Sequence, residues 1–179
     1  MNAISRFFGH LHTVNRHRFK VFVHCVKAGI PGHGLRHDLS KYSPTEFIPG
    51  VRFFQGDRSP NEKEREKYGH SFAWMHHKGR NRHHFEYWWD YDPATKAVAA
   101  VKMPSKWFVE MFCDRVAACK IYQKEKYTDS SPLEYFRRAK HERIIHPETR
   151  RELEELLVML SQKGEKETFR YIRKNKNNF

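Results

Sequence analysis

Residues 37–46 read His37-Asp38-Leu39-Ser40-Lys41-Tyr42-Ser43-Pro44-Thr45-Glu46, and they combine an adjacent His-Asp pair with a helix start. At the end of this stretch a serine precedes a proline, and a glutamate follows two residues later. Serine and glutamate side chains in these positions accept hydrogen bonds from otherwise unpaired backbone N–H groups, and proline has a φ angle suited to the first helical position. The stretch therefore predicts a helix that begins at Pro44.

The same pattern occurs twice more along the chain and predicts two further helix starts. The two occurrences are Ser59-Pro60-Asn61-Glu62 and Ser131-Pro132-Leu133-Glu134. A fourth start is predicted at Pro147-Glu148 because leucines follow it at helical spacing before Gly164. These leucines are Leu153, Leu156, Leu157 and Leu160.

Two more helices are predicted over residues 5–28 and 104–122. Gly29-Ile30-Pro31-Gly32 ends the first of them, because glycine favours the left-handed conformation that closes helices and proline cannot continue one. No long segment alternates polar and apolar residues with period two, and no β-hairpin signal is found. The pattern thus indicates an all-α protein.

The segments between these helices show no sign of a domain boundary. Residues 90–94 and 128–131 are predicted to be loops, and the Lys- and Asn-rich residues 170–179 are predicted to form a frayed basic tail. No linker divides the chain. We therefore expect residues 1–179 to form a single compact helical domain of about six or seven helices.

The chain of 179 residues carries a formal net charge of +13, and 15% of its residues are aromatic. Disordered chains hold few aromatic residues, so a folded domain is predicted. The positive charge favours partners with phosphate or carboxylate groups, such as nucleotides, nucleic acid or an acidic surface. Three cysteines without a CxxC spacing favour a reducing, cytoplasmic location. No apolar run approaches the roughly 20 residues of a membrane span, so no membrane partner is predicted.

The beginning of the chain has a second interpretation. No aspartate or glutamate precedes Asp38, and an acid-free, basic stretch is also typical of organelle transit peptides. Because this stretch runs without interruption into His37-Asp38, we assign it to the domain.

Single polar side chains stand among apolar ones on two of the predicted helices. His17 shares a face of helix 5–28 with Val14 and Val21, because these residues are three or four positions apart. Asp114 lies on a mostly apolar face of helix 104–122, where a carboxylate costs several kcal/mol unless a cation accompanies it. For each residue taken alone, a hydrogen-bonded core histidine or a buried salt bridge remains an alternative to a metal ligand.

The His37-Asp38 pair can place an imidazole nitrogen and a carboxylate oxygen on one metal ion. Lys41 follows one turn beyond Asp38, where its ammonium group can neutralise a phosphate. The His-Asp dipeptide alone is common. The specific feature is the order of the whole set, in which His17 precedes His37-Asp38 and Asp114 follows on a later helix.

This order resembles the HD-domain phosphohydrolase superfamily, in which a His…His-Asp…Asp set holds a divalent metal within an all-α bundle. The resemblance implies that the ligands of a first metal are His17, His37, Asp38 and Asp114. The superfamily usually continues the pair as His-Asp-x-Gly-Lys, whereas Ser40 stands here in place of the glycine. The separation between His17 and His37 is also shorter than is typical of the superfamily.

Two pairs of adjacent histidines, His76-His77 and His83-His84, flank a basic stretch. Some members of the superfamily carry extra histidines between the His-Asp pair and the last aspartate, and these histidines ligate a second metal. The resemblance therefore implies a second set of ligands, for which we choose His77 and His83. The spacing leaves the choice within each pair open, because Gly79 is expected to break the helix.

Three motifs also resemble a smaller, uncharacterised family of bacterial and phage proteins. They occupy residues 37–43, 73–88 and 146–150 and read HDLSKYS, AWMHHKGRNRHHFEYW and HPETR. This resemblance covers about residues 17–157 and implies no particular activity.

The sequence thus predicts a metal-dependent phosphohydrolase that acts on a nucleotide or another phosphorylated small molecule. Its cofactor is expected to be one or two divalent transition-metal ions, which histidine and carboxylate ligands suit without selecting among Mn, Fe, Co, Ni and Zn. Asp38 and Lys41 are the predicted catalytic residues, with Asp38 bridging the two ions. The predicted substrate-binding residues are Lys78, Arg80 and Arg82. The glutamates considered as partners that orient ligating imidazoles are Glu46, Glu86 and Glu110.

Two other functions stay open at this point. One is a basic nucleic-acid-binding protein with a structural metal site, supported by the net charge and by the Arg, His and aromatic residues between Lys78 and Trp89. The other is a metal-stabilised scaffold without catalysis, supported by the missing glycine at Ser40.

Overall fold

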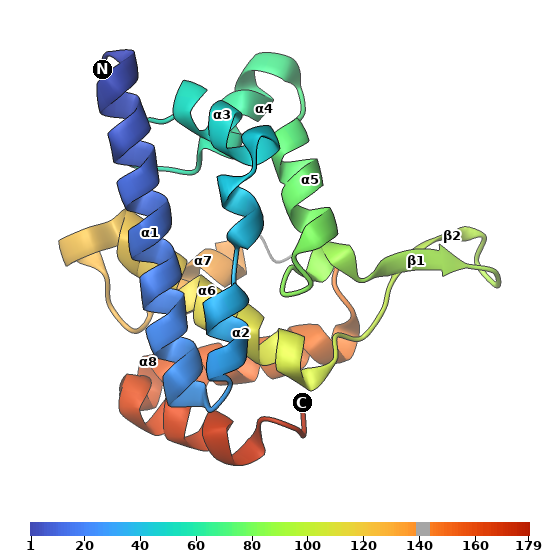
Figure 1. Ribbon diagram of the computed structural model, residues 1–179. Helices are drawn as coiled ribbons and strands as arrows, with labels where there is room; N and C mark the ends of the chain where they lie inside the picture. The colour runs from blue at the N-terminus through green and yellow to red at the C-terminus, as the bar shows by residue number, and fades with distance from the viewer. Residues whose placement is uncertain (139–143) are drawn as a thin grey trace.

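The computed structural model describes residues 1–138 and 144–179, and most of these residues are helical (Figure 1). The described residues include eight α-helices, which confirms the predicted all-α class. The helices are α1 (Ala3–Ala28), α2 (Pro31–Arg36), α3 (Pro44–Arg52), α4 (Pro60–Tyr68), α5 (Phe72–Arg80), α6 (Ser105–Gln123), α7 (Ser131–Arg138) and α8 (Pro147–Asn175). Three short 3-10 helices join them: η1 (Leu39–Tyr42), η2 (Phe85–Tyr87) and η3 (Lys124–Lys126).

The predicted helix starts agree closely with the structure. Helices α3, α4 and α8 begin at the predicted prolines, and α7 begins one residue before its proline. The Ser59 hydroxyl accepts a hydrogen bond from the Asn61 N–H, as the capping pattern predicts. The Ser43 hydroxyl makes no such bond and has no hydrogen-bond partner among the described residues. For α3, the preset φ angle of Pro44 and the local sequence therefore define the start without a serine cap.

Helix α6 forms the centre of the hydrophobic core. Its apolar residues point in all directions around the helix axis, which is the pattern of a helix enclosed by others. Helices α1, α7 and α8 pack around it (Figure 1). The fully buried side chains of this core include Phe108, Phe112, Val116, Phe136, Leu153, Leu157 and Ile172.

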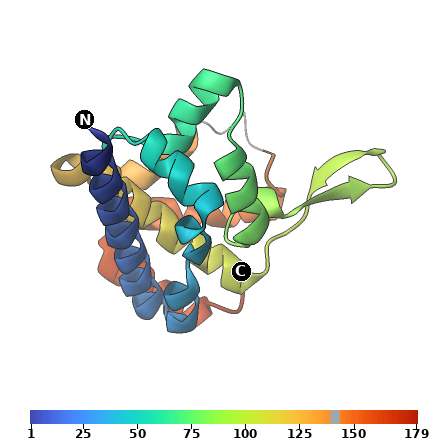
Figure 2. The ribbon, with the colours of Figure 1, turned by 45° about the horizontal axis from the view of Figure 1, so that its top comes forward.

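A β-hairpin, which the sequence analysis did not predict, leaves the helical body after η2. Strand β1 (Trp89–Asp92) pairs antiparallel with β2 (Ala97–Ala100), and both views show the hairpin extending away from the helices (Figures 1 and 2). The prediction of a loop at residues 90–94 is therefore wrong for residues 90–92, which belong to β1. The turn contains no Asn-Gly type signal. Instead, the Asp92 carboxylate accepts hydrogen bonds from the Ala94 N–H and the Thr95 hydroxyl, which stabilises the turn locally.

The C-terminal residues are also more ordered than the sequence analysis expected. Helix α8 continues to Asn175 after a break at Gly164, whose φ of 73° is readily adopted by glycine. Ile172 is fully buried, and the Phe179 ring packs 5.1 Å from the Phe108 ring. The Ser105 hydroxyl donates a hydrogen bond to the Phe179 carbonyl oxygen. Apolar contacts with α6 therefore hold a segment whose charged composition had predicted fraying.

No described helix is both long enough and apolar enough to cross a lipid bilayer.

Two buried histidines of α1 make the fold sensitive to acid. Burial lowers the pKa of His10 and of His24 to about 4, so both remain neutral in the folded protein at a pH where the unfolded chain takes up protons. As the pH falls from 6.5 towards 4, the unfolded state gains protons that the folded state does not, so the free energy of unfolding decreases. Each histidine is expected to lower the free energy of unfolding at pH 5 by about 2 kcal/mol.

We therefore predict that His24→Gln weakens the pH dependence of stability. The free energy of unfolding would be measured by urea denaturation at pH 7.5 and pH 5 with EDTA present, and His12→Gln on the exposed side of α1 is the control. The difference between the two pH values should shrink by about 2 kcal/mol in His24→Gln and stay unchanged in His12→Gln. An unchanged difference in His24→Gln would contradict the prediction.

Candidate metal centre

The six predicted metal ligands come together in the structure, although they belong to different elements. Helix α1 contributes His17 and α6 contributes Asp114, and the His17 Nε2 lies 2.9 Å from the Asp114 Oδ1. The other four ligands are His37 and Asp38 between α2 and η1, His77 on α5, and His83 in the turn after α5. Because α1 and α6 pack side by side, two residues that are distant in the sequence face each other.

Asp38 occupies a sharp turn of the backbone. Its φ of 54° and ψ of 28° lie in the left-handed region, which residues other than glycine rarely adopt. The Arg18 guanidinium supports this turn by donating hydrogen bonds to the carbonyl oxygens of His37 and Leu35, at 2.8 and 3.1 Å. The turn directs the Asp38 carboxylate into the protein, where the residue is only 2% exposed.

One oxygen of Asp38 faces the ligands predicted for the first metal. Its Oδ2 lies 3.3 Å from the His37 Nε2 and 3.7 Å from the His17 Nε2. The Asp114 Oδ1 lies 3.8 Å from the same His37 nitrogen. We call the four residues that surround this point, His17, His37, Asp38 and Asp114, the first half-site.

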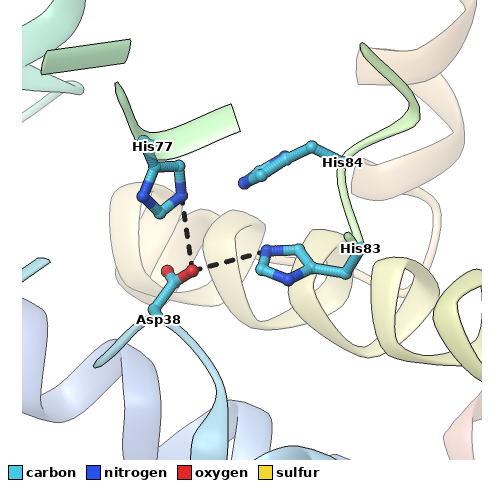
Figure 3. Close-up of side chains that lie close together, drawn as sticks. All are labelled: Asp38, His77, His83 and His84. Carbon is cyan, nitrogen blue, oxygen red and sulfur yellow. Dashed lines mark ion pairs between the residues drawn. The ribbon is translucent and has the colours of Figure 1, made fainter. Parts of the chain in front are cut away.

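The other oxygen of Asp38 faces a second group of histidines. Its Oδ1 lies 3.3 Å from the His77 Nε2 and 3.4 Å from the His83 Nε2 (Figure 3). The His84 ring points into the same space, and the ligand atoms of these four residues lie within 4.8 Å of one another. We call Asp38, His77, His83 and His84 the second half-site. Asp38 is common to both half-sites.

Three polar atoms of the second half-site are buried without a hydrogen-bond partner among the described residues. They are the Asp38 Oδ1, the His83 Nε2 and the His84 Nε2. A buried polar group without a partner costs about 1–3 kcal/mol, and more when it is charged. The close approach of one carboxylate oxygen and two imidazole nitrogens provides donor atoms of the kind that divalent transition metals bind. The residues therefore fit a metal ion, and the cluster could hold one.

Two glutamates behind the ligands determine which nitrogen of each imidazole faces the site. The Glu110 carboxylate accepts a hydrogen bond from the His37 Nδ1 at 2.9 Å and lies 3.2 Å from the His83 Nδ1. Glu46 accepts a hydrogen bond from the His77 Nδ1 at 2.7 Å. In each case the Nδ1 faces a carboxylate and carries a proton, so the Nε2 is the nitrogen positioned to bind a metal. Two of the three glutamates considered from the sequence, Glu46 and Glu110, thus contact predicted ligands.

The charges of the centre depend on one another. Burial opposes ionisation of Asp38 and Asp114, but neighbouring histidines, together with Lys41 beside Asp38, hold the pKa of both carboxyl groups well below the usual value. Burial also disfavours a charged His37, yet Asp38, Glu110 and Asp114 raise its pKa to about 10. Burial and the neighbouring histidines lower the pKa of His84, so that residue is neutral. The carboxylates are therefore ionised, and a metal would displace a proton from His37.

The structure distinguishes the members of each histidine pair. His77 is buried in the second half-site, whereas His76 lies to one side, where its Nδ1 donates a hydrogen bond to Glu46. Both His83 and His84 face the centre, so His84 is a member of the cluster that was not predicted from the sequence. Helix α5 continues through Gly79 to Arg80, contrary to the expected break, and the turn that follows directs both adjacent histidines inward. A turn does not impose the alternating directions of a strand or the 100° steps of a helix.

A cleft of about 260 Å³ opens beside the centre. Part of its wall comes from α1 and α6, which contribute residues at spacings of three to four. Lys41 and Arg58 are among its basic residues. The α1 residues are His10, Thr13, Val14 and His17, and the α6 residues are Asp114, Ala118 and Tyr122. Asp38, His77 and His84 also line the cleft, so both half-sites are accessible from it.

The residues predicted to bind substrate lie away from this cleft. Lys78, Arg80 and Arg82 are not among the residues that line this cleft. The Lys78 ammonium group lies 4.8 Å from the centre of the Trp89 ring, and the Arg82 guanidinium lies 5.6 Å from that of Tyr87. Arg80 is exposed on the surface. The three residues come at the end of α5 and in the turn beyond it, where cation–π contacts hold Lys78 and Arg82.

The fold and this cluster define an all-helical protein with a buried group of histidines and carboxylates that could hold a divalent metal. A protein-family model described as a family of unknown function (DUF5662) matches residues 6–159, and the chain belongs to this family. This result agrees with the uncharacterised family expected from the sequence. Comparison with curated proteins and with solved structures gave no match.

We predict that Asp38→Ala abolishes binding of divalent transition metals, because both half-sites lose their common carboxylate. Wild-type protein with Mn²⁺ or Co²⁺ at about 100 times the dissociation constant should gain about 2.7 kcal/mol of stability for each ion. That gain corresponds to a rise of at least about 5 °C in the melting temperature for a chain of this size. Calorimetry and elemental analysis after dialysis would measure both effects.

The control for this experiment is His12→Ala, which removes an exposed histidine from α1 outside the centre. It should bind metal as the wild type does. Equal metal content in Asp38→Ala and wild type would show that the ions bind elsewhere.

Proposed function

We propose that this protein is a metal-dependent phosphohydrolase of the HD type that acts on a nucleotide or another phosphorylated small molecule. One observation carries the proposal: the His/Asp centre lies beside a cleft that also contains the lysine ammonium group of Lys41. A metal ion and a fixed cation next to an open cleft are the components that hydrolysis of a phosphate ester requires.

The order of the ligands along the chain supports this class of enzyme. His17, His37-Asp38 and Asp114 follow the His…His-Asp…Asp order of the HD superfamily, and they meet at one point of an all-α fold. The histidines of the second half-site stand between Asp38 and Asp114 in the sequence. Asp38 presents one carboxylate oxygen to each half-site, as expected of a ligand that bridges two ions.

A divalent ion bound here would act as a Lewis acid and activate a water molecule for attack on phosphorus. The protein's own contribution is to fix the donors in advance. His37 is fully buried and held by Glu110, and His77 is held by Glu46, so neither imidazole has to be ordered when substrate enters. Such prior ordering lowers the cost of charge stabilisation during the reaction.

Lys41 is placed to bind the phosphate. Its Nζ lies 3.1 Å from the Asp38 Oδ2, and its side chain is 27% exposed. Burial disfavours the charged ammonium, but the carboxylates of Asp38 and Asp114 raise the pKa of Lys41 above its usual value. The side chain therefore stays protonated, and its position on the cleft wall brings a positive charge beside the centre.

The geometry favours catalysis over the two alternatives. A structural metal site has all its coordination positions filled by protein and is closed, whereas this centre adjoins a cleft. The nucleic-acid alternative depends on the basic stretch after α5. In the structure, aromatic rings contact Lys78 and Arg82 in that stretch, which leaves their charges less available to a phosphate backbone.

We predict that Lys41→Gln lowers kcat/KM about 100-fold, the usual effect of removing one donor that stabilises transition-state charge. Activity would be screened with Mn²⁺ or Co²⁺ on nucleoside phosphates, sugar phosphates and phosphodiesters, and then measured on the best substrate. Lys78→Gln serves as the matched control, because it removes the same charge outside the cleft. It should leave kcat/KM unchanged.

Metal content should be the same in Lys41→Gln and in the wild type. If no phosphorylated compound is hydrolysed by metal-loaded wild-type protein, the proposal is wrong. If Lys78→Gln loses activity as strongly as Lys41→Gln, the assignment of the cleft as the substrate site is wrong.

A further inference from the structure

The Glu110 carboxylate lies behind the ligands and contacts one imidazole of each half-site. It is 2% exposed on the central helix α6, and three imidazoles surround it. Its Oε1 accepts a hydrogen bond from the His37 Nδ1 at 2.9 Å and lies 3.2 Å from the His83 Nδ1. Its Oε2 accepts one from the His33 Nδ1 at 2.8 Å.

These contacts link residues that belong to different half-sites. His37 presents its Nε2 to the first half-site, and His83 presents its Nε2 to the second. One oxygen of Glu110 thus fixes the tautomer and the ring direction of one imidazole on each side. The two oxygens of Glu110 together contact all three imidazoles.

We infer that Glu110 is a positioning residue shared by both half-sites, so that a single carboxylate controls the affinity for two ions. This inference rests on the proposed function, because it requires that the half-sites bind metal. Hydrogen-bonding partners of this kind usually contribute 10- to 100-fold to metal affinity. In this protein, Glu110 should increase the metal affinity of both half-sites.

Glu110 is itself anchored away from the centre. His33 on α2 holds the second oxygen, and the His33 ring packs edge-on against Trp107 with centroids 4.7 Å apart. The carboxylate therefore cannot rotate freely toward either half-site. This anchor explains why both Oε1 contacts can be maintained by one side chain.

Glu46 provides a natural comparison within the same protein. Its two oxygens accept hydrogen bonds from the Nδ1 atoms of His76 and His77, both at 2.7 Å. Of these two histidines only His77 belongs to a half-site, and that is the second one. Glu46 is also buried, with 7% of its surface exposed, but it contacts only one half-site. Replacing Glu46 should therefore weaken metal binding at the second half-site and leave metal binding at the first unchanged.

The test separates the two ions by removing a ligand from one half-site at a time. In a His84→Ala background the second half-site loses a ligand, so a Co²⁺ titration followed by visible absorbance reports the first half-site. Glu110→Gln and Glu46→Gln would each be added to this background. We expect Glu110→Gln to weaken Co²⁺ binding about 10- to 100-fold and Glu46→Gln to leave it unchanged.

The mirror experiment uses His17→Ala, which leaves the second half-site. There both glutamate variants should weaken Co²⁺ binding and alter the absorbance of the bound ion. A merely structural role for Glu110 would lower the melting temperature of the metal-free protein without changing that spectrum. If Glu110→Gln does not fold, His33→Gln replaces it, because that change releases the other oxygen and should weaken binding in both backgrounds.

The outcomes distinguish this inference from the proposed function. Wild-type protein that binds no Co²⁺ would overturn both. Wild-type protein that binds two ions, with Glu110→Gln weakening binding in one background only or in neither, would overturn the role of Glu110 and leave the proposed function standing.

Discussion

The burial of ionised carboxylates is the constraint around which this molecule is arranged. Asp38, Glu46 and Glu110 are each less than a tenth exposed, and Asp114 lies beside them. Carboxylates in such positions cost several kcal/mol unless cations or N–H donors compensate them. In this protein most of the compensating groups are imidazoles, which come from α1, α2, α5 and the turn after α5. Elements far apart in the sequence are therefore held together by paired charges as well as by apolar contacts.

Helix α6 connects this polar centre to the hydrophobic core. One face carries Glu110 and Asp114 at a spacing of four residues, and this face meets the histidines. Another face carries Phe108 and Phe112 at the same spacing, and both are fully buried among apolar residues. The packing of the core thus fixes the rotation of α6 about its axis. That rotation in turn determines where the two carboxylates lie.

Much of the local structure could be predicted from the sequence, because its causes are local. A proline such as Pro44 or Pro147 fixes its own φ angle, and helical spacing alone predicts that His17 and Asp114 lie on inward faces. The role of His84 and the direction of Lys78 could not be predicted in this way. Both depend on how the chain turns after α5 and on which aromatic ring lies nearby in three dimensions. The hairpin escaped prediction because a carboxylate side chain stabilises its turn in place of a glycine.

The arrangement of the first half-site follows from the way α2 packs against α1. Helix α2 has only six residues, too few to be stable alone, so its position depends on what it packs against. A Cβ at Gly34 would lie 2.8 Å from the Phe22 Cα, so only glycine allows α2 to approach α1 this closely. Arg18, one residue after His17, then holds the carbonyl oxygen of His37. The same helix that carries the first ligand therefore positions the His-Asp pair beside it. The ligands are set in place by packing and hydrogen bonds, which reduces the ordering cost of binding a metal.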